Sequence, residues 1–176
     1  MRGESKRQQI EKLMDEIGRV AREPGCVYFT GGVTAVLLGW REMTVDVDLK
    51  LEPEPLGIFD ALPRLKEELE INIELAAPDD FIPALDGWQG RSQFIARHGK
   101  VDFFHYDFYA QALAKIERWH ARDRGDVGAM LAGGLVERGR LREFFNAIAP
   151  RLVRYPAIDV EMFRRRVESV TQEGRG

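Results

Sequence analysis

The chain has 176 residues, of which 44% are hydrophobic and 31% charged, which is enough for one domain or for a small domain with a helical extension. No apolar run approaches the ~18 residues needed to cross a bilayer. The single cysteine excludes an internal disulfide framework and a cysteine-based zinc site. The polar beginning of the sequence does not resemble a signal peptide. We therefore expect a cytoplasmic protein with no membrane segment.

The net charge is −3, which excludes a general affinity of the whole chain for nucleic acid. The distribution is uneven, because residues 137–166 hold eight arginines and four acidic residues. This basic stretch is typical of solvated helix faces and favours RNA as a partner only weakly.

The hydrophobic periodicity predicts alternating helices and strands in the first part of the chain. We expect helices over 5–22 (with Ser5 as N-cap), 33–38 and 56–69, and strands over 27–30, 45–51, 71–75, 92–98 and 101–106. From Asp107 onward the pattern is helical, with helices near 107–121, 122–133, 137–149 and 159–172 and a frayed end at 173–176. The sequence thus predicts an α/β (α+β) fold: a small mixed sheet with flanking helices over 1–106, followed by a C-terminal helical bundle over 107–176.

Two aspartates lie in the strand predicted over 45–51, where polar and apolar residues alternate strictly. Asp46 and Asp48 then point to the same face, about 6–7 Å apart along the strand. Paired carboxylates at this spacing suit a hard cation such as Mg²⁺ or Mn²⁺. A solvated strand face is the alternative, although aspartate is a poor strand former.

A glycine pair, Gly31 and Gly32, ends the preceding strand and opens a helix, and thirteen residues separate it from Asp46. Such a turn can present backbone N–H groups to a triphosphate, while tight packing is the alternative reason for the glycines. No Gly-Lys-Ser/Thr follows, so the turn is not a Walker loop.

Together, Gly31, Gly32, Asp46 and Asp48 resemble the signature of the polymerase-β-like nucleotidyltransferase superfamily. The resemblance implies Mg²⁺ (or Mn²⁺) on the two aspartates and a nucleoside triphosphate over the glycines. Many members have serine after the glycine pair, where this chain has Val33 followed by Thr34. Thr34 is counted with the two glycines among the candidate nucleotide-binding residues.

Members of this superfamily usually add a third carboxylate from a neighbouring strand. Asp102, in the strand predicted over 101–106, is the first choice as third metal ligand or as base for the acceptor hydroxyl. Glu74 is a second choice. The alternative for Asp102 is a hairpin aspartate that accepts local hydrogen bonds.

A second group of charged residues lies in the segment 112–131. On an ideal helix, Lys115, Arg118, Arg122 and Asp126 fall within ~80° of one another, and Asp123 lies among apolar positions. One interpretation is a surface ladder of ion pairs from Arg118 and Arg122 to Asp126. The other is that Lys115 and Arg118 contact phosphates, while Asp123 or Asp126 orients them or serves the metal.

The pattern Lys-x-x-Arg followed by Arg-Asp-x-x-Asp resembles the AbiEii-type nucleotidyltransferases, which include toxins of type IV toxin–antitoxin systems. Lys115, Arg118, Arg122, Asp123 and Asp126 occupy the matching positions. The resemblance implies transfer of a nucleotidyl group to an acceptor such as tRNA, and a cognate antitoxin protein as a partner. It places the chain nearest a compact group of bacterial nucleotidyltransferase-like proteins.

The residues therefore predict a metal-dependent nucleotidyltransferase. Two alternatives stay open: a catalytically weak binding or toxin–antitoxin partner module with the same fold, and a small-molecule nucleotidyltransferase of the antibiotic-modifying type. The histidines, including His105, are expected to be structural. Phe103 and Phe104 are expected in the core, with base stacking as the second interpretation.

Overall fold

The computed structural model describes residues 5–172, so the frayed end predicted for 173–176 lies outside the described residues. The chain forms two compact units. The sheet unit comprises the residues up to Ala77 together with Ser92–Tyr106, and the helical unit comprises Pro78–Arg91 together with the residues from Asp107 onward.

The sheet unit is built around a five-stranded mixed sheet with the strand order β5-β4-β2-β7-β6. Its strands are β2 (Gly25–Thr30), β4 (Asp46–Leu51), β5 (Asn72–Leu75), β6 (Gln93–His98) and β7 (Val101–His105). Strand β2 pairs antiparallel with β4 and parallel with β7, β4 pairs parallel with β5, and β6 pairs antiparallel with β7. The predicted α+β class with a small mixed sheet is confirmed.

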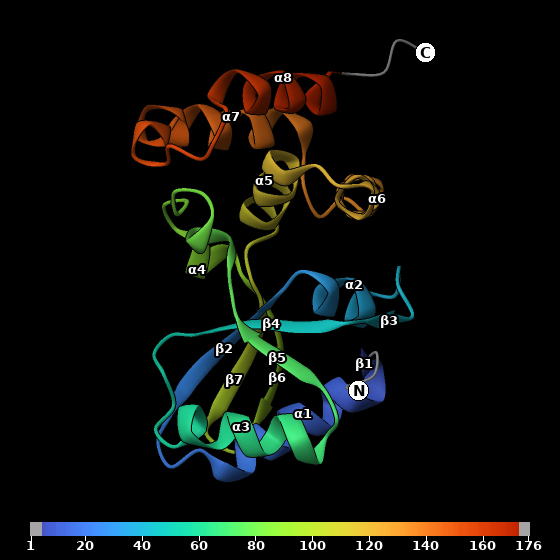
Figure 1. Cartoon of the computed structure of the whole chain (residues 1–176), viewed down its shortest axis with the longest axis vertical. Coiled ribbons are helices and arrows are strands. Elements are labelled where there is room, and N and C mark those ends of the chain that lie inside the picture. Colours follow the sequence, from blue (N-terminus) through green and yellow to red (C-terminus); the bar gives the residue numbers. More distant parts are fainter. Residues whose placement is uncertain (1–4, 173–176) are drawn as a thin grey trace. The chain divides into compact units, whose positions relative to one another are not determined.

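Three helices accompany this sheet: α1 (Arg7–Val20), α2 (Gly32–Leu38) and α3 (Ile58–Glu68). Figure 1 shows α1 and α3 next to each other along the strands. Their buried side chains, such as Leu13 and Leu65, form one core with Val27, Phe29 and Phe103 from one face of the sheet. The alternation of β2, β4 and β7 therefore leaves the other face for the polar and aromatic residues discussed below.

The beginning of α1 differs from the prediction. Ser5 and Lys6 form a two-residue strand, β1, which pairs antiparallel with β3 (Met43–Thr44). Ser5 is fully buried, and the N-cap of α1 is Lys6. The prediction that Ser5 caps the helix is therefore wrong, because the pairing with Thr44 keeps Ser5 in an extended strand one residue before the cap.

The helical unit contains α4 (Trp88–Arg91), α5 (Phe108–Arg118), α6 (Ala121–Ala132), α7 (Arg138–Ile148) and α8 (Val160–Thr171), with short 3-10 turns at Pro78–Asp80 and Ala149–Arg154. Asp107 caps α5 by accepting a hydrogen bond from the backbone N–H of Tyr109 at 3.1 Å. Helices α7 and α8 pack against each other through Phe145 and Phe163, one from each helix, whose ring centroids are 4.9 Å apart. Within residues 5–172, none of the helices has the length and apolarity to cross a membrane.

Candidate functional site

Asp46 and Asp48 lie on the same face of β4, and both are half-buried. The intervening Val47 and the following Leu49 point to the opposite face and are fully buried in the core. The register of the sheet is therefore fixed, since a slip by one residue would bury the carboxylates and expose the apolar side chains. The predicted alternation is confirmed for Asp46–Leu51, whereas Val45 precedes the strand and is exposed.

The glycine pair lies directly beside Asp48. Gly31 has φ +64° and ψ −134°, a conformation suited to glycine. A Cβ atom on Gly31 would lie 2.9 Å from Oδ2 of Asp48, so the missing side chain leaves room for the carboxylate. Glycine is needed at position 32 for a different reason, because a Cβ atom there would overlap with Oγ1 of Thr44. One glycine thus accommodates the strand carboxylate and the other permits tight packing.

Strand β5 brings two further polar residues to the same face. Asn72 pairs in register with Asp46, and Glu74 pairs with Asp48. The side-chain amide of Asn72 donates to Oδ1 of Asp46 at 2.5 Å and to Oε1 of Glu74 at 3.3 Å. Asn72 was not among the predicted site residues, although the apolar Ile71 and Ile73 indicated that Asn72 and Glu74 share a face.

Asp102 lies elsewhere, which corrects its assignment as the third carboxylate. It pairs in register with Cys26 on β2, whereas Asp48 pairs with Thr30 four residues further along the same strand. At ~3.3 Å per residue this separates the two by about 13 Å. Both oxygens of Asp102 accept hydrogen bonds from Arg97, at 2.6 and 2.9 Å. The hydrogen bonds from Arg97 hold the pKa of Asp102 below its usual value.

Thr34 is also unsuited to its predicted contact with a phosphate. It is fully buried, and its Oγ1 lies 3.0 Å from Nδ1 of His105. Burial lowers the pKa of His105 to about 4. The pair therefore links α2 to the end of β7 inside the protein, where the hydroxyl of Thr34 is not accessible to a ligand.

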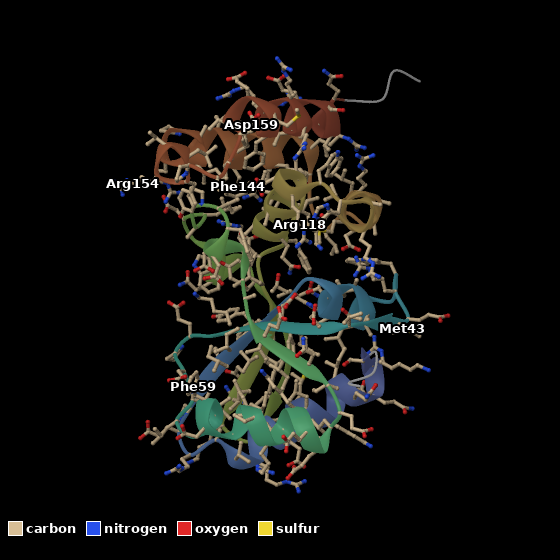
Figure 2. The ribbon with its side chains drawn as sticks, in the orientation of Figure 1. Met43, Phe59, Arg118, Phe144, Arg154 and Asp159 are labelled. Atoms are coloured by element: carbon tan, nitrogen blue, oxygen red, sulfur yellow. The ribbon has the colours of Figure 1, made fainter. Side chains whose placement is uncertain are left out.

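The second group of predicted residues meets at the turn between α5 and α6 (Figure 2, where Arg118 is labelled). The chain reverses at Trp119, which has a φ of +56°. Nζ of Lys115 donates to Oδ2 of Asp126 at 2.7 Å and lies 3.9 Å from Oδ1 of Asp123. Arg118 donates to both oxygens of Asp123, at 2.9 and 2.6 Å. The segment therefore consists of two helices joined by a turn, and not of the single ideal helix on which the predicted angular spacing of these residues depends.

The predicted ladder of ion pairs on the surface is therefore wrong, because Lys115, Asp123 and Asp126 are buried and form one network at the turn. Asp123 and Asp126 are 1% and 2% exposed, and Lys115 is 7% exposed. Burial by itself raises the pKa of Asp123, but the hydrogen bonds from Arg118 and from the backbone N–H of His120, with the charges of Arg118 and Lys115, outweigh it and lower the pKa. These contacts suit the role of orienting α5 against α6. Arg118 and Arg122 are exposed, as is Arg124.

A metal site made by the protein alone would need several ligands close together. Among residues 5–172, no group of three or more His, Cys, Asp or Glu side chains is arranged to hold a metal ion. No protein-family model matches the chain, no curated protein matches it, and no solved structure matches it. The functional interpretation therefore depends on the residues and contacts given above.

The Lys115–Asp126 pair predicts a large effect on stability. Asp126→Asn should lower the free energy of unfolding by roughly 3 kcal/mol, because it leaves a buried ammonium group without its nearest counter-charge. The double variant Lys115→Met with Asp126→Leu should recover most of this loss. Urea denaturation measures both. Glu68→Gln, in the exposed pair of Arg64 and Glu68, is the control and should cost less than about 1 kcal/mol. An equal loss for Asp126→Asn and Glu68→Gln would contradict the account.

Stability should also depend on pH through His105. The folded-state pKa of about 4 lies below the value of 6.5 for an unperturbed histidine, so the unfolded chain binds the proton first as the pH falls. The unfolding free energy should therefore decrease from pH 6.5 toward pH 4, by roughly 3 kcal/mol in total. His105→Gln should flatten the profile between pH 6.5 and 5, measured by thermal unfolding. The exposed His120→Gln is the control, and an unchanged slope in His105→Gln would exclude this origin.

Proposed function

We propose that the chain is a metal-dependent nucleotidyltransferase that moves a nucleotidyl group from a nucleoside triphosphate to an acceptor. The observation that carries the proposal is the position of the Asp48 carboxylate against the backbone of Gly31, with Asp46 on the same strand face. The two weak sequence signals, a glycine turn and an Asp-x-Asp strand, are therefore neighbours in space. This supports the resemblance to the polymerase-β-like nucleotidyltransferases.

The residues at this position fit Mg²⁺ or Mn²⁺. Mg²⁺ is commonly held by one or two carboxylates, with substrate phosphates and water as the remaining ligands. Asp46 and Asp48 would supply those carboxylates, and Asn72 holds one oxygen of Asp46 in place through its hydrogen bond. Glu74, in register with Asp48, replaces Asp102 as the nearest additional carboxylate. A bound metal would supply charge neutralisation at the reacting phosphate.

In the proposed reaction, an acceptor hydroxyl forms a bond to the α-phosphorus while the bond from that phosphorus to the departing pyrophosphate breaks. The hydroxyl proton passes to a base, for which the carboxylates of the strand face are candidates. The glycine turn would lie beside the triphosphate. Within the helical unit, the resemblance implies a phosphate contact for Arg122, while Lys115, Arg118, Asp123 and Asp126 form the network that holds the α5–α6 turn.

The acceptor is proposed from the resemblance alone, with tRNA first, as in type IV toxins, and a cognate antitoxin as a protein partner. A small-molecule acceptor is the alternative within the same reaction class. A labelled triphosphate incubated with RNA, with protein and with small hydroxyl compounds distinguishes them by where the label appears.

One observation favours a second candidate function. The ammonium group of Lys115 is occupied by Asp126 and Asp123, and the hydroxyl of Thr34 is occupied by His105. Two of the residues expected to contact the nucleotide are therefore engaged inside the protein. This arrangement would suit a module that keeps the fold for binding a partner and turns over slowly.

The enzymatic proposal predicts Mg²⁺-dependent binding of a nucleoside triphosphate, measured by titration calorimetry with each of the common triphosphates. Asp46→Asn and Asp48→Asn should weaken this binding by at least ~10-fold, since even partners of metal ligands contribute that much to metal affinity. Asp60→Asn changes an exposed carboxylate on α3 and serves as the control. Failure of the unaltered protein to bind any triphosphate with Mg²⁺ would favour the partner-binding module.

A further inference from the structure

The sheet unit carries an aromatic row on the face opposite the core. Tyr28 on β2 pairs in register with Phe104 on β7, and Phe104 pairs with Phe94 on β6. The rings of Tyr28 and Phe104 are stacked with centroids 5.1 Å apart, and Phe94 meets Phe104 edge-on at 5.7 Å. The three rings (the aromatic row) thus run across adjacent strands to the edge of the sheet.

A bulge in β6 places Phe94 in this row. The register shifts between Phe94 and Ala96, so Ile95 is the extra residue. Without the bulge, alternation would direct Phe94 to the same face as Ala96, which is the core face. Instead, Ile95 packs against the core and Phe94 is 55% exposed on the other face. The bulge thus places an exposed phenylalanine next to the half-buried Phe104 at the sheet edge, a pair of rings that offers an apolar surface for stacking.

The next row along the same strands is polar. Cys26, Asp102 and Arg97 follow one another across β2, β7 and β6, roughly 6–7 Å from the aromatic row. A recess of about 430 Å³ lies here, lined by residues that include Pro53, Lys100 and these three. On the other side of the aromatic row, Lys50 pairs in register with Tyr28. Tyr28 is buried and Lys50 pairs with Glu52 at 3.5 Å. The exposed part of the row is therefore Phe94 with the half-buried Phe104, and Arg97 and Lys100 are the cationic side chains beside it.

We propose that this face binds single-stranded nucleic acid. Bases stack on exposed aromatic rings of a sheet whatever their identity, and the adjacent cations meet the phosphates. A base on Phe94 and Phe104 would place its phosphate toward Lys100 and Arg97. Because Asp102 already neutralises Arg97, stacking supplies most of the affinity, and the dependence of binding on salt is shallow, with a slope near one phosphate contact.

The test is fluorescence anisotropy of a short fluorescein-labelled oligouridine with the full chain, without Mg²⁺ or triphosphate. Phe94→Ala should weaken binding about tenfold or more, the effect of losing one stacked base. Phe94→Tyr keeps a ring and should bind like the unaltered protein. Phe59→Ala removes an equally exposed ring (58%) from α3 and is the matched control (Figure 2, where Phe59 is labelled).

Three outcomes would overturn the proposal: no binding of the oligonucleotide, equal binding by Phe94→Ala, or equal losses in Phe94→Ala and Phe59→Ala. A duplex of the same length that binds as tightly as the single strand would also exclude stacking on the aromatic row. Asp48→Asn should bind the oligonucleotide normally, so the result does not depend on the nucleotidyl-transfer proposal. A protein strand that pairs with the edge of β6 would instead leave oligonucleotide binding undetected.

Discussion

The close approach of the Asp48 carboxylate to the backbone of Gly31 is the constraint on which the candidate site depends. It requires glycine at that position for two reasons, the positive φ and the space that a Cβ would occupy. It also requires β4 to pair antiparallel with β2 in the observed register, with Thr30 opposite Asp48. Burial of Val47 and Leu49 on the far side of β4 then keeps that register in place. The core thus determines where the carboxylates point.

In the helical unit, the charged residues stabilise the turn between α5 and α6 by pairing with one another. Four ionisable side chains at the α5–α6 turn neutralise one another, and the turn at Trp119 brings residues from two helices together. Such a network stabilises the protein only when every partner is present, because a buried charge left alone is costly. Its members are therefore better suited to hold a shape than to exchange partners with a ligand. Arg122 is an exposed cation of the same segment outside this network.

The sequence was sufficient for features that depend on local pattern. The alternation of 45–51 and of 71–75 identified strands and their faces, and the apolar spacing located the helices. Position along the sheet could not be obtained this way. Asp102 was assigned to the metal because the resemblance implies a third carboxylate from a neighbouring strand. Its strand, β7, lies next to β2 and not next to β4, and it runs parallel to β2 from the far end. The bulge at Ile95 was missed for a similar reason, since it depends on packing partners distant in sequence. A break between the two helices was predicted at 121/122, but the reversal at Trp119 that brings Lys115 and Asp126 together was not.

The central claim is that Asp46 and Asp48 hold a divalent metal beside the glycine turn. Crystals grown with Mn²⁺ and a non-hydrolysable triphosphate test it directly, because the anomalous scattering of manganese locates the ion. The account predicts one manganese peak within roughly 2–2.5 Å of oxygens from both aspartates, with phosphates next to Gly31. A manganese peak away from both carboxylates, or triphosphate density away from the glycine turn, would contradict it.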